Sequence, residues 1–173
     1  MREREVGTLE QIMVSPITSL EFILGKTVPS FVIGAGTVSL VTLLGTLWFG
    51  IPFVGSLGVM AVGTTLFLLA TIALGLVLST FSRTQQQAFA LNFFFVNPFF
   101  ILSGFAFPIA AMPRALQWFT LINPLRYFLV VIRSVFLKGV GFAVLWPELG
   151  AMALLATTMM LVSVLRFRAS LEG

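Results

Sequence analysis

Four long apolar stretches restrict the fold of this chain more than any other feature of the sequence. They cover residues 27–49, 57–79, 88–107 and 146–165, and the one charged residue within them is Glu148. A helix of about 20 residues crosses the hydrocarbon core of a bilayer, which is about 30 Å thick. A spanning segment must also satisfy its backbone hydrogen bonds internally. The sequence therefore predicts an all-α membrane protein with about four transmembrane helices.

The composition agrees with a membrane protein. Hydrophobic residues make up 58% of the chain and charged residues 9%, whereas soluble domains are about half apolar and about one quarter charged. The net charge of +4 then acts on topology and on lipid headgroups. We expect membrane lipids as partners and no nucleic acid.

Several residue types needed for catalysis are missing. The sequence contains no His, Cys or Asp, so it lacks a His general base, a thiol nucleophile and the usual zinc ligands. A Gly-x-x-x-x-Gly-Lys-Ser/Thr phosphate loop is also absent. We therefore predict no catalytic, cofactor or metal site in this chain, and any ATP hydrolysis would belong to a partner.

The distribution of cations predicts the topology. With the N-terminus in the cytosol, six Lys and Arg residues lie on the inner side and four lie in the long outer loop. This excess follows the positive-inside rule. We expect both termini to be cytosolic.

Residues 1–26 differ from the rest of the chain, residues 27–173, which we assign to the transmembrane domain. Thr8 and Gln11 fit a capping box that starts a short helix, and Pro16 ends it. We expect a cytosolic helix here, and the alternative is a tail that lies on the lipid surface.

A second helix is expected just before the first span. Thr18 and Glu21 repeat the capping pattern, and Pro29 cannot donate a hydrogen bond to the carbonyl of Gly25. We predict an elbow where an interfacial helix turns into the membrane. Its residues are Gly25, Lys26 and Pro29.

The outer loop is predicted to contain short helices over residues 112–138. Pro113 and Pro124 each suit a first helical turn. After Pro124, apolar residues recur at helical spacing, with the cations off that stripe; they are Leu125, Phe128, Leu129, Ile132, Val135 and Phe136. This segment is predicted to lie in the outer interface or to dip into the membrane as a re-entrant helix.

Polar and small residues within the spans leave alternatives open. Asn97 could be a polar contact in a cavity for cargo, or it could support the backbone bond freed by Pro98. Thr71, Gly75 and Ser79 form a small-residue stripe that suits packing within the chain or between two subunits.

Two separated motifs resemble the ABC-2 type transporter permease family. Residues 4–16, followed by Gly25, Lys26 and Pro29, resemble the cytosolic loop of these permeases. Residues 102–108 and the downstream positions Met112, Pro113, Asn123, Pro124, Tyr127, Arg133 and Gly139 resemble the outer signature. Such permeases usually have six membrane helices per subunit or half, and this sequence resembles the C-terminal part of that pattern alone. The resemblance therefore implies a truncated product or one piece of a split permease.

The resemblance also implies partners and functional residues. Residues 5–16 would be the coupling helix that docks on a cytosolic ABC ATP-binding subunit, which would hold ATP and magnesium. The implied docking residues are Glu5, Gly7, Thr8, Glu10, Gln11 and Pro16. An outer gate is implied at Gly104, Pro108, Pro113, Pro124, Tyr127 and Arg133. Arg126 and Arg133 could instead anchor lipid headgroups.

The function implied is that of a truncated transmembrane permease subunit of an ATP-driven exporter. It would lie in the bacterial inner membrane as a multi-pass protein, in a homodimer or heterodimer of permeases. The expected cargo is an amphipathic, lipid, glycan or drug-like molecule. The alternative is a non-transporting membrane anchor or assembly protein derived from a permease fragment.

Overall fold

A computed structural model of the chain describes residues 19–82 and 84–172. Over this part the chain is helical and contains no strand. The helices are α3 (Ser19–Leu47), α4 (Leu57–Phe81), α5 (Gln85–Ile101), α6 (Arg114–Thr120), α7 (Pro124–Arg133) and α8 (Phe142–Glu172). Two short helices complete the order: η1 (Ile109–Ala111), a 3₁₀ turn, and η2 (Ser134–Lys138), a π-helical continuation of α7. The prediction of an all-α membrane protein is confirmed.

Side-chain caps explain where several helices begin. The Ser56 hydroxyl accepts a hydrogen bond from the Gly58 amide at 3.2 Å and caps α4, and the Thr84 hydroxyl caps α5 through the Gln87 amide. Asn123 caps α7, with Pro124 at its first position. These are residue types favoured at helix starts.

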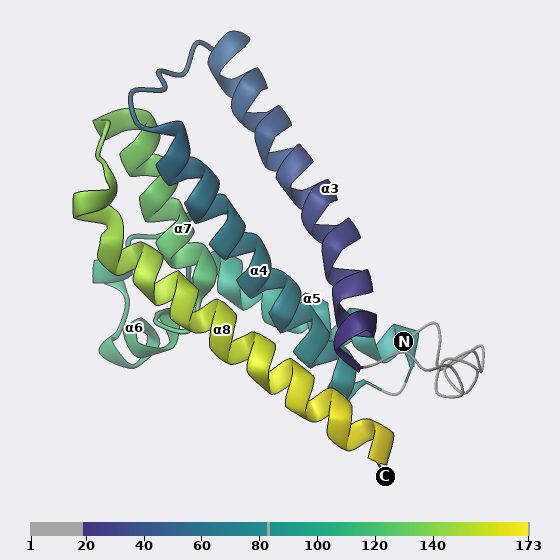
Figure 1. Ribbon diagram of the computed structural model, residues 1–173. Helices are drawn as coiled ribbons and strands as arrows, with labels where there is room; N and C mark the ends of the chain where they lie inside the picture. The colour runs from purple at the N-terminus through teal and green to yellow at the C-terminus, as the bar shows by residue number, and fades with distance from the viewer. Residues whose placement is uncertain (1–18, 83, 173) are drawn as a thin grey trace.

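The core lies where α4, α7 and α8 pack against one another (Figure 1). The Phe67 ring of α4 stacks on the Phe128 ring of α7, with 4.3 Å between ring centroids and 3° between planes. The buried core side chains are Val59, Met60, Phe128, Val131, Val135, Leu145, Leu149 and Met152. Burial of this cluster therefore holds α7 inside the bundle.

Helix α3 is attached more loosely than the other long helices. It contacts mainly α4, where Gly34 lies against the side chain of Leu68. Figure 1 shows the C-terminal half of α3 leaning away from α4. Most of its large apolar side chains, such as Leu40, Leu44 and Leu47, are exposed.

Among the residues that the structure describes, three helices are long and apolar enough to cross a membrane: Leu24–Leu47, Leu57–Phe81 and Phe142–Arg166. A fourth span is possible if the bent pair Arg114–Thr120 and Pro124–Lys138, which turns by 81°, counts as one. The prediction of about four spans thus agrees in number, but its third span does not agree in position.

Helix α5 does not extend over the whole predicted span 88–107. Helix α5 begins at Gln85 and ends at Ile101, and its 17 residues are fewer than a typical span. The Ser103 hydroxyl donates to the Phe100 carbonyl and accepts from the Phe105 amide. Gly104, at φ +85°, then turns the chain. The helix therefore ends at a turn made by a hydroxyl side chain and a glycine with positive φ. A hydropathy scan of the sequence does not detect such a turn.

The predicted span 146–165 lies entirely within helix α8. Helix α8 starts at Phe142 and includes Pro147. Pro147 is the sixth residue of α8, so the helix continues past it although the carbonyl of Ala143 loses its helical donor. The helix therefore covers the whole predicted span and extends beyond it at both ends.

The placement of the outer segment favours the re-entrant alternative over the interfacial one. Helix α7 packs against α4 and α8. The predicted stripe is the face that packs, since Phe128 and Val135 are buried and Leu125, Ile132 and Phe136 pack around them. The helical periodicity was therefore right.

Candidate functional site

The predicted docking residues lie outside the described part of the chain. These are Glu5, Gly7, Thr8, Glu10, Gln11 and Pro16. Their role in binding an ATP-binding subunit stays a prediction.

The predicted membrane-entry elbow lies within the first turns of α3. The helix continues through Pro29, and the Ser30 hydroxyl donates to the Lys26 carbonyl at 3.0 Å. Gly25 is exposed and has no atom within 4 Å of where a Cβ would lie. The chain therefore passes these positions without a break in the helix, and their role in membrane entry stays a prediction.

The structure brings two of the predicted gate residues together. The Arg133 guanidinium of α7 donates to the Gly104 carbonyl at 3.3 Å. Gly104 has φ +85°, a conformation that residues with a Cβ rarely adopt, and Ile109 lies 3.1 Å from its virtual Cβ. The turn after α5 is thus fixed to α7.

The other predicted gate residues start or brace the short helices. Pro108 precedes η1, Pro113 precedes α6, and Pro124 is the first residue of α7. The Tyr127 hydroxyl donates to the Leu121 carbonyl at 3.0 Å and links α7 to the end of α6. These residues shape a compact hairpin, and their role in an outer gate stays a prediction.

The most buried polar side chains of this hairpin are Asn123, which belongs to the motif that resembles the outer signature, and Thr120, which the sequence did not single out. The amide of Asn123 is fully buried, donates to the Phe99 carbonyl of α5 at 2.6 Å and accepts from the Leu125 amide at 3.0 Å. Thr120 is also fully buried, and its hydroxyl accepts from Arg126 and donates to Gln117. Asn before Pro was a usable signal for the cap, but nothing local predicts the bond to Phe99.

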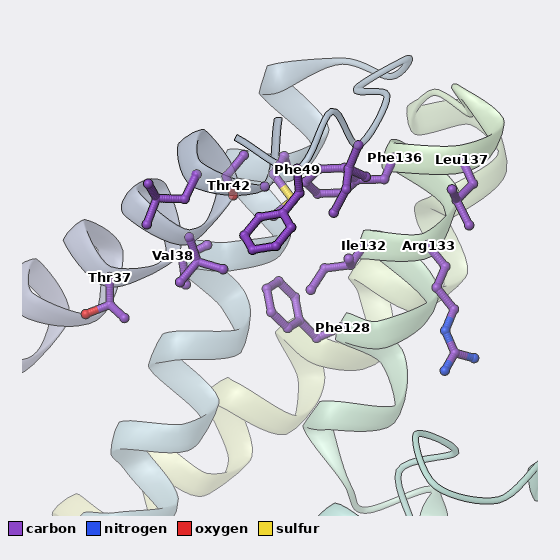
Figure 2. A pocket seen from close by; sticks show the side chains of 14 residues that line it. Thr37, Val38, Thr42, Phe49, Phe128, Ile132, Arg133, Phe136 and Leu137 are labelled. Atoms are coloured by element: carbon purple, nitrogen blue, oxygen red, sulfur yellow. The ribbon is translucent and has the colours of Figure 1, made fainter. Parts of the chain in front are cut away.

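An apolar pocket of about 700 Å³ lies between α3, α4 and α7. Figure 2 shows the side chains of Phe49, Phe128 and Ile132 facing one another across it, while the Arg133 guanidinium points away. Its polar lining residues are Thr37, Thr42 and Arg133. Thr37 donates its hydroxyl proton to the Ile33 carbonyl. The pocket has the size of a small-molecule site and is suited to an apolar group.

Asn97 does not line this pocket. It is exposed on α5, and its amide donates to the Phe93 carbonyl at 3.0 Å. The carbonyl that Pro98 leaves without its helical partner is that of Phe94, so the amide does not replace the lost bond directly. A cargo contact at Asn97 stays a prediction.

Gly75, in the predicted small-residue stripe, and Gly63 differ in what they contact. A Cβ at Gly75 would meet nothing within 4 Å, whereas one at Gly63 of the same helix would lie 2.9 Å from Val131. The close approach of α4 to α7 is therefore at Gly63, which the stripe did not identify. Packing of Gly75 within the described residues is excluded.

Comparison with known proteins identifies the family. The family described as ABC-2 type transporter matches residues 1–137. The chain belongs to the ABC-2 type transporter family. The resemblance drawn from the two sequence motifs is thereby confirmed.

Three Escherichia coli proteins illustrate the relationship. The chain is 36% identical over 157 residues to a protein named probable multidrug ABC transporter permease YbhR, and the match covers 91% of this chain and 43% of that protein. It is 39% identical over 140 residues to a second protein named probable multidrug ABC transporter permease, YbhS. That match covers 80% of this chain and 37% of YbhS. The chain is 31% identical over 171 residues to inner membrane transport permease YhhJ. That match covers 97% of this chain and 45% of YhhJ.

The chain thus spans less than half the length of these relatives. No solved structure matches it. The family is therefore shown by sequence, and the arrangement of the helices comes from the fold described above.

Proposed function

We propose that this chain forms part of the transmembrane permease subunit of an ATP-driven exporter in a bacterial inner membrane. The observation that carries the proposal is the family match over residues 1–137, which includes both the N-terminal segment and the outer hairpin. Relatives named as ABC transporter permeases support it.

In this proposal, the N-terminal segment receives the motion of an ATP-binding subunit. Glu5 and Glu10 provide charge in a segment with capping residues, and the segment leads directly into α3. ATP and magnesium bind to the partner, and this chain transmits its movement. Two permease subunits, identical or different, form the pathway.

The proposed cargo is an amphipathic or drug-like molecule with a large apolar part. Two relatives carry the word multidrug in their names, and the pocket between α3, α4 and α7 is apolar and about 700 Å³. Pockets of 300–1,000 Å³ are typical of sites for such ligands.

Charge reversal tests the proposed docking. The variant E5K/E10K should lose copurification of the ATP-binding subunit, because both proposed contacts change sign. The matched control is E172K, a charge reversal at the other end of the chain, which should retain the subunit. Equal recovery of the subunit with all three proteins would refute docking through these residues. Absence of the subunit from all three purifications would instead favour the alternative of a non-transporting membrane anchor.

A further inference from the structure

A second, smaller pocket lies in the outer hairpin and contains two arginines. It has a volume of about 340 Å³. Its lining residues are Ile109, Arg114, Gln117, Trp118, Leu121 and Arg126. We call it the two-arginine pocket. It lies where α6 and α7 meet at an angle of 81°, and it shares none of its lining residues with the apolar pocket.

Arg126 is held in place by its surroundings. One guanidinium nitrogen donates to the hydroxyl of the fully buried Thr120. The guanidinium carbon lies 5.6 Å from the centre of the Tyr127 ring. A guanidinium carries five N–H donors. Within the described residues, the Arg126 guanidinium uses one of them, in the bond to Thr120. Arg126 is therefore preorganised with donors to spare.

The positive charge of the pocket is not balanced by a nearby acid. The sequence contains no acidic residue between Glu21 and Glu148. Within the described part of the chain, no carboxylate oxygen lies within 4.0 Å of Arg114 or Arg126. Two arginines that line the same open pocket without a counter-ion favour the binding of an anion.

The pocket walls favour an anion that has an apolar part. Trp118 and Leu121 are exposed beside the arginines, and Trp is a residue type typical of membrane interfaces. The planar guanidinium matches the oxygens of a phosphate. We propose that the two-arginine pocket binds the phosphate group of an amphipathic molecule whose net charge is negative, which a zwitterionic headgroup does not provide. Arg114 and Arg126 contact the phosphate, and Trp118 contacts the apolar part.

Trp118 allows a direct test. The chain contains three Trp residues, so the double substitution W48F/W146F leaves Trp118 as the one indole fluorophore. In this background, phosphatidylglycerol with brominated acyl chains should quench Trp118 at lower mole fraction than brominated phosphatidylcholine. The substitution R114Q should reduce this preference about tenfold, because one charge-assisted hydrogen bond is lost.

Two further variants separate binding from folding. R126Q should also reduce the preference, but it removes the bond to Thr120 as well. R114Q has no such structural cost, because the Arg114 side chain makes no hydrogen bond or ion pair with the described residues. K138Q removes a cation that does not line the pocket and should leave the preference unchanged. Equal quenching by both lipids, or a preference that R114Q and R126Q both retain, would overturn the proposal.

Inorganic phosphate identifies the source of the anion. If phosphate relieves the quenching by phosphatidylglycerol while chloride of equal ionic strength does not, the pocket recognises a free phosphate group. If neither anion relieves it and the lipid preference persists, the pocket recognises the phosphate of a membrane lipid. Both results support an anion site. The inference goes beyond transport, and its failure would leave the docking test unaffected.

Discussion

At the scale of single residues, Asn123 connects two helices that the sequence places far apart. Its side chain caps α7 and also donates to the Phe99 carbonyl of α5. The cap follows from the Asn-Pro pair. The second bond could not be predicted, because it depends on where α5 ends.

Replacing Asn123 with Ala should lower the stability of the chain by about 1–3 kcal/mol, because a buried carbonyl and the first turn of α7 lose their partner. Thermal unfolding in detergent measures this loss. Asn92 is exposed on α5, so N92A is the control and should change the midpoint little. Equal midpoints for N123A and N92A would contradict the role of Asn123.

Two glycines on α4 give a second residue-scale prediction. Gly63 faces the stiff, fully buried Val131, and Gly75 faces open space. G63A should destabilise the chain by about 1–3 kcal/mol through overpacking, whereas G75A should stabilise it by about 0.5–1 kcal/mol because Ala is the better helix former. Chemical denaturation of both variants tests the ranking. If G63A is as stable as G75A, the close contact between α4 and α7 is wrong.

At the scale of elements, α7 shows what periodicity can and cannot predict. The stripe that includes Phe128 and Val135 identified the helix and its apolar face correctly. Periodicity does not distinguish a face buried in protein from one buried in lipid. Its packing between α4 and α8 is set by tertiary contacts, such as the one at Gly63.

The burial of α7 predicts a large effect of truncating its central aromatic residue. F128A removes the stacking on Phe67 and leaves a cavity, so stability should fall by about 3–5 kcal/mol. Val130 is exposed on the same helix, and V130A should cost much less. Comparing the two midpoints in detergent measures the difference. A small effect of F128A would show that α7 does not pack in the core.

The element boundaries show a second limit of the sequence. The length and apolarity of residues 88–107 favoured a full span, yet α5 ends at Ile101. The end depends on the Ser103 hydroxyl and on the positive φ of Gly104. Such turns follow from local hydrogen bonding that hydropathy does not record.

At the scale of the whole molecule, large apolar surfaces remain exposed on α3 and α5. Examples are Leu47 on α3 and Phe89 and Phe94 on α5. Exposed apolar surface of this extent suits lipid or further protein. The predicted topology, with both termini in the cytosol, places the N-terminal ends of α3 and α5 on the cytosolic side.

The chain contains no Cys, so single cysteines can test the topology. P52C lies between α3 and α4, and Q86C lies at the start of α5. With a cytosolic N-terminus, a membrane-impermeant maleimide should label P52C in intact cells and Q86C after permeabilisation alone. The reverse pattern would show that the orientation is inverted.

The central claim, that the N-terminal segment docks on an ATP-binding subunit, is tested most directly by crosslinking in living cells. In one variant a photoreactive amino acid replaces Glu10. In the control variant it replaces Gly50, which follows the C-terminal end of α3. Mass spectrometry then identifies the crosslinked partners. The account predicts an ABC ATP-binding subunit crosslinked from position 10 and not from position 50. A chain that yields no such subunit from position 10, while the subunit is present in the cells, would contradict it.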